Sequence, residues 1–115
     1  MSRHDDITPM RHMLEYARTA RRLMAGRIRS DLDTDEMLRL AMIRAVEVVG
    51  EAARRVSPEL RDRHPTIPWS QAAGTRDRLV HGYDQVDLDI LWDILTLDLP
   101  PMISELERIL GPESE

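Results

Sequence analysis

The chain of 115 residues has 42% apolar and 3% aromatic residues, no cysteine and a net charge of −5. This length suits one domain with a modest core, and the absence of cysteine excludes disulfides and thiolate metal sites. The negative charge argues against a protein that coats DNA. We expect a single all-α domain over residues 1–115, with its core from about 8 to 111, because the apolar residues are mainly aliphatic.

The charges are unevenly distributed along the chain. All 16 basic residues are arginine; 13 of them lie in residues 1–63 beside 11 acidic residues, whereas residues 64–115 hold 3 arginines and 10 acidic residues. No N-terminal apolar run resembles a signal peptide, and none approaches the ~20 residues of a membrane span. A cytoplasmic protein that does not enter a membrane is therefore the expected class.

The first predicted helix runs from about residue 8 to 27. Thr8 is its predicted N-cap, with Pro9 at the first helical position. Apolar residues then recur at helical spacing: Met10, Met13, Leu14, Ala17, Ala20 and Met24. Residues 26–35 read as a connection, in which Asp33 or Thr34 caps the next helix.

The second predicted helix, 34–56, is the longest uninterrupted pattern. Its apolar stripe is broadened by Met37, Leu40, Ala41 and Val48, which predicts that much of the helix is buried. Its polar face predicts an ion-pair ladder. Acid–base chemistry by Glu47 and Glu51 is the weaker interpretation, because neighbouring arginines would keep both carboxylates ionised. The polar face consists of Arg44, Glu47, Glu51, Arg54 and Arg55.

The second half predicts a short helical turn and extended chain over 57–69, then two further helices. Ser70 caps a helix over about 70–82 that ends at Gly82. Another helix begins near Asp87, and Pro100-Pro101 is expected to kink or break it before the pattern resumes to Gly111. The predicted architecture is an up-down bundle of four to five helices.

The stretch TRDRLVHGYD, residues 75–84, concentrates the reactive side chains. On a helix Asp77 and His81 share a face, so the carboxylate could orient the imidazole as it does in general-base histidines. Arg76 or Arg78 could hold a phosphate beside it. An Asp–His pair at this spacing is more often a surface salt link than a catalytic dyad. The other histidines, His4, His12 and His64, lack metal-ligand spacing, so no metal or cofactor is expected.

Several motifs in order resemble the HepT-like toxins of the HEPN superfamily, over roughly residues 10–110. RAVEVVGEAARRVS (44–57) is similar to the family's Glu-x-x-Gly-Glu-Ala helix, and PTIPW (65–69) to its Ile-Pro-Trp turn. The Arg-x4-His-x-Tyr signature is matched by Arg76, His81 and Tyr83, and the position after the arginine is often polar, as Asp77 is. LPPMISELERIL resembles the usual ending.

This resemblance implies an HEPN-like helical bundle that forms a symmetric homodimer, with two motif helices sharing one cleft. It implies a toxin that cleaves RNA, with tRNA or mRNA as the substrate. Cleavage would need no metal and would proceed by attack of the RNA 2′-OH, with Arg76 and His81 as the catalytic residues. Asp77 and Arg78 would support them, and Glu47 and Glu51 are candidate polar residues of the cleft. The implied partner is a minimal nucleotidyltransferase antitoxin that neutralises the toxin by transferring AMP to Tyr83.

Two alternatives stay open. The chain could be a non-catalytic HEPN module that binds the nucleotidyltransferase, or a helical bundle without nucleotide chemistry. The motif lies in the acidic half of the chain, so an RNA site there requires basic residues of the first half, Arg44, Arg54 and Arg55, to face it.

Overall fold

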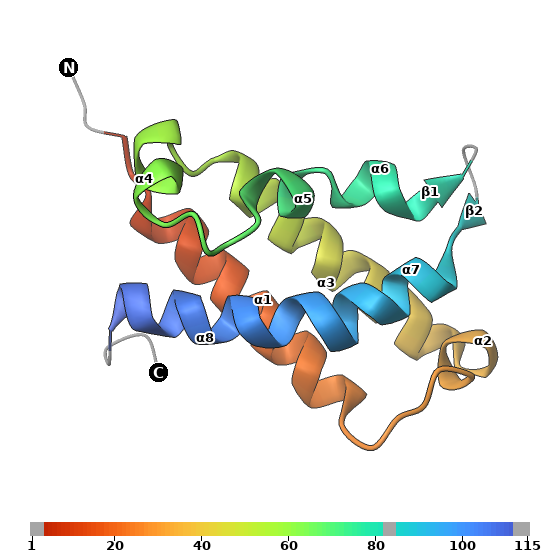
Figure 1. The fold of residues 1–115 in the computed structure, drawn as a ribbon. Coiled ribbons are helices and arrows are strands. Elements are labelled where there is room, and N and C mark those ends of the chain that lie inside the picture. The colour runs from red at the N-terminus through yellow and green to blue at the C-terminus, as the bar shows by residue number, and fades with distance from the viewer. Residues whose placement is uncertain (1–3, 82–84, 112–115) are drawn as a thin grey trace.

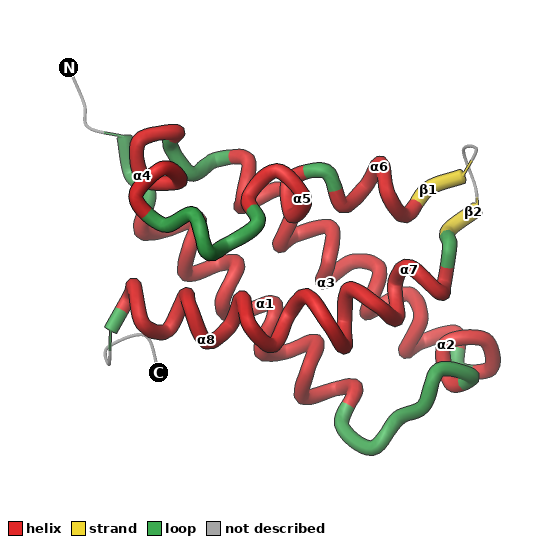
Figure 2. The backbone as a smooth tube through the Cα atoms, in the orientation of Figure 1, coloured by secondary structure: helices red, strands yellow, loops and turns green. Residues whose placement is uncertain are grey.

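Three long helical segments build the protein, as the computed structural model in Figure 1 shows for the described residues 4–81 and 85–111. They are α1 (Ile7–Met24), α3 (Glu36–Arg54) and the continuous run of α7 (Leu88–Asp93), η1 (Ile94–Asp98) and α8 (Leu99–Leu110). The short elements are α2 (Asp31–Thr34), α4 (Pro58–Arg63), α5 (Trp69–Ala73), α6 (Thr75–Leu79), β1 (Val80–His81) and β2 (Gln85–Val86). Figure 2 shows how helix dominates the described chain, which confirms the all-α prediction.

The first helix begins and ends earlier than predicted. It starts at Ile7, so Thr8 is not its N-cap; instead, Asp5 Oδ1 accepts the backbone N–H groups of Ile7 (2.9 Å) and Thr8 (3.2 Å). Hydrogen bonds from the Thr8 side chain and backbone lower the pKa of the Asp5 carboxyl. The helix ends at Met24 because Gly26 follows with φ of 77°, a conformation that suits glycine and stops a right-handed helix.

A short helix and an aspartate cap precede α3. The predicted connection contains α2, which the sequence pattern did not indicate. Neither Asp33 nor Thr34 caps the next helix; Asp35 does so, with its side chain accepting the Leu38 backbone N–H at 3.0 Å. Because α1, α2 and α5 pack against α3 without enclosing it, the broad burial that we expected is wrong at Met37 and Leu40, which are 83% and 58% exposed.

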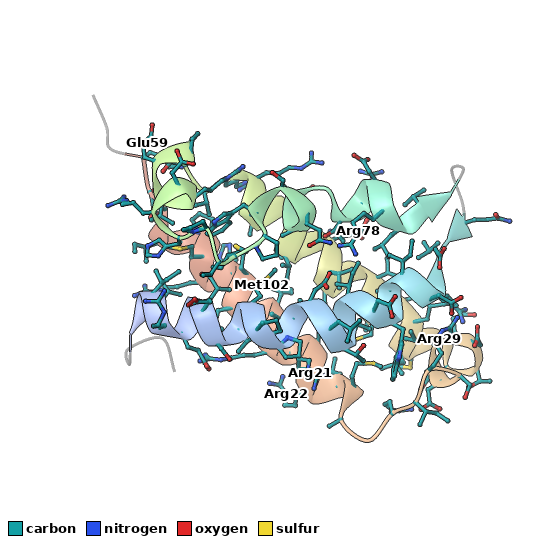
Figure 3. All side chains as sticks on the ribbon, in the orientation of Figure 1. Arg21, Arg22, Arg29, Glu59, Arg78 and Met102 are labelled. Carbon is teal, nitrogen blue, oxygen red and sulfur yellow. The ribbon has the colours of Figure 1, made fainter. Side chains whose placement is uncertain are left out.

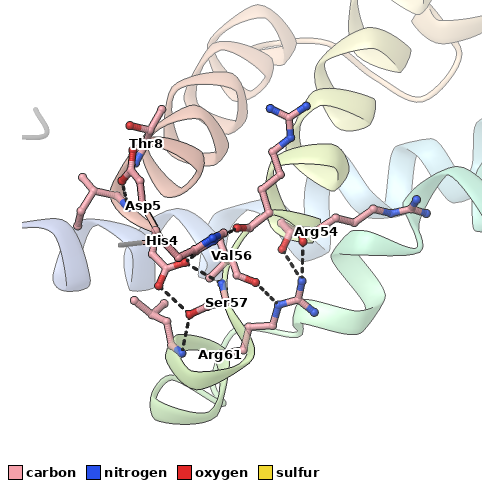
Figure 4. Close-up of polar contacts among 12 residues, drawn as sticks. His4, Asp5, Thr8, Arg54, Val56, Ser57 and Arg61 are labelled. Atoms are coloured by element: carbon pink, nitrogen blue, oxygen red, sulfur yellow. Dashed lines mark hydrogen bonds and ion pairs between the residues drawn. The ribbon is translucent and has the colours of Figure 1, made fainter. Parts of the chain in front are cut away.

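Arg61 and Ser57 hold the C-terminal end of α3 to its surroundings (Figure 4). Ser57 caps α4 by accepting the Leu60 N–H at 3.3 Å, and its own N–H and hydroxyl donate to the two carboxylate oxygens of Asp6, each at 2.7 Å. The Arg61 guanidinium donates to three carbonyl oxygens at the end of the helix, those of Ala53 (2.9 Å), Arg54 (3.1 Å) and Val56 (3.0 Å). These bonds satisfy carbonyls that a helix end otherwise leaves without partners.

Of the kink or break expected at Pro100-Pro101, the break does not occur. The chain stays helical from α7 to α8, and the turn just before the prolines widens into the π-helical segment η1, where the Leu99 N–H bonds to the Ile94 carbonyl. Prolines remove backbone donors from the following turn. One carbonyl in this region, that of Leu95, accepts a hydrogen bond from Arg21 Nη1 at 3.2 Å. The wider turn thus accommodates the prolines without ending the helix.

The apolar core is built from α1, α3 and the α7–α8 run, with further buried side chains from α2 and from the segment that contains α5 and α6. The largest fully buried side chains are Met10, Met13, Leu14, Leu32, Met42, Val46, Ile67, Leu79, Leu91, Leu95, Leu99 and Leu106.

None of the helices in the described part of the chain is long and apolar enough to cross a membrane.

Candidate active site

A close backbone approach places the segment that carries the motif on α3. A Cβ atom added at Gly50 would lie 2.8 Å from the Ala72 carbonyl oxygen, closer than real Cβ atoms come. The same carbonyl accepts the Thr75 hydroxyl at 2.7 Å, and the Thr75 side chain is buried. Arg54 Nε donates to the next carbonyl, that of Ala73, at 3.0 Å. Gly50 in the Glu-x-x-Gly-Glu-Ala motif therefore lets α5 contact α3 directly.

The three polar residues of α6 have different surroundings. Arg78 turns inward, where its Nη1 lies 3.2 Å from Asp98 Oδ2 of η1, and Figure 3 places it between α6 and the α7–α8 run. Arg76 is two positions earlier, about 200° away around a helix. It is exposed, as is Asp77, and neither side chain has a hydrogen bond or ion pair with any residue in the described ranges. The two candidate phosphate-binding arginines are thus distinguished by their partners.

The motif helix is shorter than predicted and does not reach His81. Gly74 separates α5 from α6, α6 ends at Leu79, and β1 pairs antiparallel with β2, with His81 opposite Gln85. The Asp87 N–H also donates to the Leu79 carbonyl at 2.7 Å, which draws the returning chain against the end of α6. The expected helical register between Asp77 and His81 is therefore wrong.

Part of the motif lies outside the described residues. This applies to the His81 side chain and to residues 82–84, which include Gly82 and Tyr83. The predicted end of the helix at Gly82 is superseded by the end at Leu79, while the roles assigned to His81 and Tyr83 stay predictions.

The predicted ion-pair ladder on α3 is absent. Glu47 is half-buried and Glu51 is exposed, and neither forms an ion pair with the arginines on this face in the described chain. Arg54 turns towards α5, whereas Arg44 and Arg55 line a hollow between α3 and α1. These three arginines therefore lie on two sides of α3, and among them only Arg54 contacts the segment that leads into the motif.

Most arginines described by the structure hold the fold together. Nine donate to carboxylates or backbone carbonyls: Arg18, Arg21, Arg27, Arg29, Arg39, Arg54, Arg61, Arg78 and Arg108. Six guanidinium groups have no such partner within residues 4–81 and 85–111: Arg11, Arg22, Arg44, Arg55, Arg63 and Arg76. Composition could not separate the two groups, because the separation depends on which carbonyls and carboxylates the fold brings within reach.

Comparison with known proteins identifies the family. A putative RNase of Caldanaerobacter subterraneus subsp. tengcongensis is 30% identical over 90% of this chain and 93% of its own. A probable ribonuclease HepT of Thermococcus cleftensis is 35% identical over 69% of this chain and 72% of its own. No solved structure gives a significant match. The model of the family described as Ribonuclease HepT-like matches residues 13–109, and the chain therefore belongs to the HepT-like family of HEPN proteins.

Proposed function

We propose that this protein is a metal-independent ribonuclease of a HEPN toxin–antitoxin system, with Arg76 and His81 as its catalytic residues. The observation that supports this assignment most directly is the contrast on α6. Arg78 is engaged by Asp98, whereas the exposed Arg76 has no partner in the described chain and is available to a phosphate. Family membership and the ribonuclease names of the relatives support the same chemistry.

The proposed reaction uses the nucleophile that RNA itself carries. A base removes the 2′-OH proton, a bond forms between O2′ and phosphorus, and the bond from phosphorus to the 5′-oxygen breaks as an acid protonates that oxygen. The products are a 2′,3′-cyclic phosphate and a 5′-hydroxyl. Arg76 stabilises the charge on the phosphorane oxygens, and His81 serves as base or acid.

A homodimer would supply both proton-transfer roles. One chain contributes one motif histidine, so two copies sharing a cleft provide a base and an acid. Exposed apolar side chains support an association: Met37 and Leu40, three residues apart on α3, are 83% and 58% exposed. Size-exclusion chromatography with light scattering tests this, with a dimer expected; a monomer that cleaves RNA would contradict the shared cleft.

Neutralisation is proposed to act on Tyr83, two residues after His81. A minimal nucleotidyltransferase would join the tyrosine oxygen to the α-phosphate of ATP and release pyrophosphate. The attached anionic group would compete with RNA for Arg76. Tyr83→Phe should then stay toxic when the transferase is co-expressed; a Tyr83→Phe protein that is still silenced through modification would contradict this proposal.

The decisive experiment is a denaturing gel of total RNA and tRNA incubated with wild-type protein or His81→Ala in EDTA. We expect cleavage by the wild type alone, with 2′,3′-cyclic phosphate ends. Cleavage that requires magnesium and leaves 3′-hydroxyl ends would reject the mechanism. An intact-mass spectrum must show Tyr83 unmodified.

The acidic second half of the sequence favours one alternative, a non-catalytic module that docks the nucleotidyltransferase. Residues 64–115 contain 10 acidic residues and only 3 arginines. Intact RNA with unmodified wild-type protein would support that alternative. Binding to the purified transferase, measured by calorimetry, would then test the docking role directly.

A further inference from the structure

A hollow between α1 and α3 gathers basic side chains away from the motif. It has a volume of about 160 Å3. His12 lines it from α1, Arg44 and Glu51 line it from α3, and Arg55 lines it from the residue that follows α3. Val48 and Ala52 contribute apolar surface. No described residue of α6 or of the β1–β2 pair borders it. His12 belongs to no motif in the sequence, because its charged neighbours in the hollow come from a distant part of the chain.

Helical spacing explains why the α3 residues converge on this hollow. Arg44, Glu51 and Arg55 are separated by seven and four residues, so their directions around the helix differ by no more than about 40°. Arg44 and Arg55 are about 16 Å apart along the axis at 1.5 Å per residue. Their long side chains nevertheless line the same hollow. Such an arrangement can contact an extended ligand at two points.

The charged side chains of the hollow form no ion pairs within residues 4–81 and 85–111, which distinguishes it from an ordinary solvated helix face. Glu51 is four residues from Arg55, the spacing of helical ion pairs, yet neither it nor Arg44 nor Arg55 forms an ion pair in the described chain. The neighbouring Arg54 and Arg61 are both occupied by carbonyl oxygens. Two guanidinium groups therefore line a concave surface without an ion pair to any described carboxylate, although Glu51 lines the same hollow. Their unpaired donors favour an anionic ligand.

The shape and the donor set indicate which anion. Phosphate oxygens only accept hydrogen bonds, which suits Arg44, Arg55 and the imidazole of His12. Glu51 needs a donor, and a ribose hydroxyl is one. The volume lies below the roughly 300–1,000 Å3 of pockets that enclose a complete small ligand. A unit of a longer strand therefore fits better than an enclosed nucleotide.

We propose that this hollow binds a backbone phosphate and ribose of the RNA strand, with Arg44 and Arg55 on the phosphates and Glu51 on a 2′-OH. The inference rests on the proposed ribonuclease function and adds to it a second RNA contact, separate from the motif. Because Arg44 and Arg55 line a hollow that no described residue of α6 or the β1–β2 pair borders, their positive charge acts at this second contact and does not face the motif.

The test measures binding of a fluorescent single-stranded RNA by anisotropy in EDTA over a range of salt concentrations. All proteins carry His81→Ala, so that the probe is not cleaved. Arg44→Gln/Arg55→Gln is compared with Arg22→Gln/Arg63→Gln, which removes the same charge from two unpaired arginines that do not line the hollow. Thermal melts establish that both variants fold.

We expect the Arg44→Gln/Arg55→Gln variant to bind RNA about tenfold more weakly near 0.1 M salt. The slope of log affinity against log salt should fall by roughly 0.7 for each phosphate that the variant no longer neutralises. The matched control should change affinity by less than about twofold. Equal reductions in both variants would overturn the proposal, because they would reflect total charge only.

Two further measurements identify the ligand: competition by AMP, and the preference for RNA over DNA. AMP should compete poorly with RNA at the hollow; displacement of RNA by AMP that depends on Arg44 and Arg55 would assign the site to a free nucleotide and overturn the RNA assignment. Wild-type contacts to a 2′-OH should favour RNA over DNA of the same sequence, and Glu51→Ala should narrow that preference. An unchanged preference for RNA in Glu51→Ala would contradict the proposed contact between Glu51 and the ribose.

The two proposals fail separately. If the wild-type protein does not cleave RNA but its binding still depends on Arg44 and Arg55, the ribonuclease assignment fails and the binding site stands. If Arg44→Gln/Arg55→Gln, with His81 intact, binds and cleaves RNA like the wild type, the binding site fails and the catalytic assignment stands.

Discussion

The α1–α3 pair and the segment from α5 to β2 are held in place by different kinds of contact. Between α1 and α3, apolar side chains that recur at helical spacing are buried on both helices. The α5–β2 segment consists of short elements that bury single apolar side chains such as Leu79. Hydrogen bonds to its backbone carbonyls also hold it: Arg54 of α3 donates to Ala73, and the Asp87 N–H of the returning chain donates to Leu79. The proposed chemistry thus lies on the part whose position depends on a few specific contacts.

The sharpest test of this comparison uses the two arginines of α6. Arg76→Gln should lower RNA cleavage by about 10²–10³-fold, since it removes a group proposed to stabilise the transition state. Its melting temperature should stay unchanged, because Arg76 has no partner among the described residues. Cleavage rates and thermal melts measure both effects.

Arg78→Gln is the matched variant, since it changes the same residue type on the same helix. It breaks the part-buried contact with Asp98 and should cost on the order of 1 kcal/mol of unfolding free energy. A result in which Arg78→Gln abolishes cleavage without loss of stability would exchange the roles assigned to the two arginines.

Gly50→Ala should disturb the attachment of the segment to α3. Its added Cβ would lie 2.8 Å from the Ala72 carbonyl, so the backbone of α5 must shift, at a cost of roughly 1–3 kcal/mol. Urea denaturation measures the change. Ala41→Ser, at an exposed position of the same helix, is the control; equal stability of Gly50→Ala and wild type would show that α5 is not fastened here.

Thr75→Val probes, with less disturbance, the hydrogen bond that joins α6 to α5 within this segment. The variant keeps the shape of the buried side chain but loses the 2.7 Å hydrogen bond to Ala72, which should cost about 1 kcal/mol. Cleavage should fall as well, because Thr75 precedes Arg76. Denaturation and cleavage assays on one preparation would reveal whether the two effects occur together.

The smallest expected effect is a pH dependence that arises from Glu105 of α8. Hydrogen bonds from Arg108 and Thr66 lower the pKa of Glu105 below its ordinary value of 4.5. A carboxyl whose pKa is lower in the folded protein than in the unfolded chain stabilises the fold at pH values above its unfolded pKa. This stabilisation is lost as the pH falls through the folded pKa. Glu105→Gln should therefore flatten the decline of melting temperature below about pH 4.5; an unchanged decline would contradict this.

Local pattern predicted the long elements well and the motif region poorly. The apolar periodicity correctly indicated α1 and α3. At their starts, however, Asp5 replaces the expected Thr8, and Asp35 replaces the expected Asp33 or Thr34, as the source of side-chain contacts. The same reasoning extended a helix through His81, where the structure has a short strand. Strand pairing with Gln85–Val86 and the bond from Asp87 to Leu79 depend on the returning chain, which helical spacing does not represent.

Residue identity and order were sufficient to indicate a helical protein with the HepT-like motifs, because apolar spacing and motif order are properties of the chain itself. The roles of individual arginines were decided only in the folded protein. Arg78 meets Asp98, twenty residues later, while Arg44 and Arg55 meet His12 around a hollow between two helices. A guanidinium becomes structural or available according to the acceptors that packing places within its reach, and these acceptors come from distant parts of the chain.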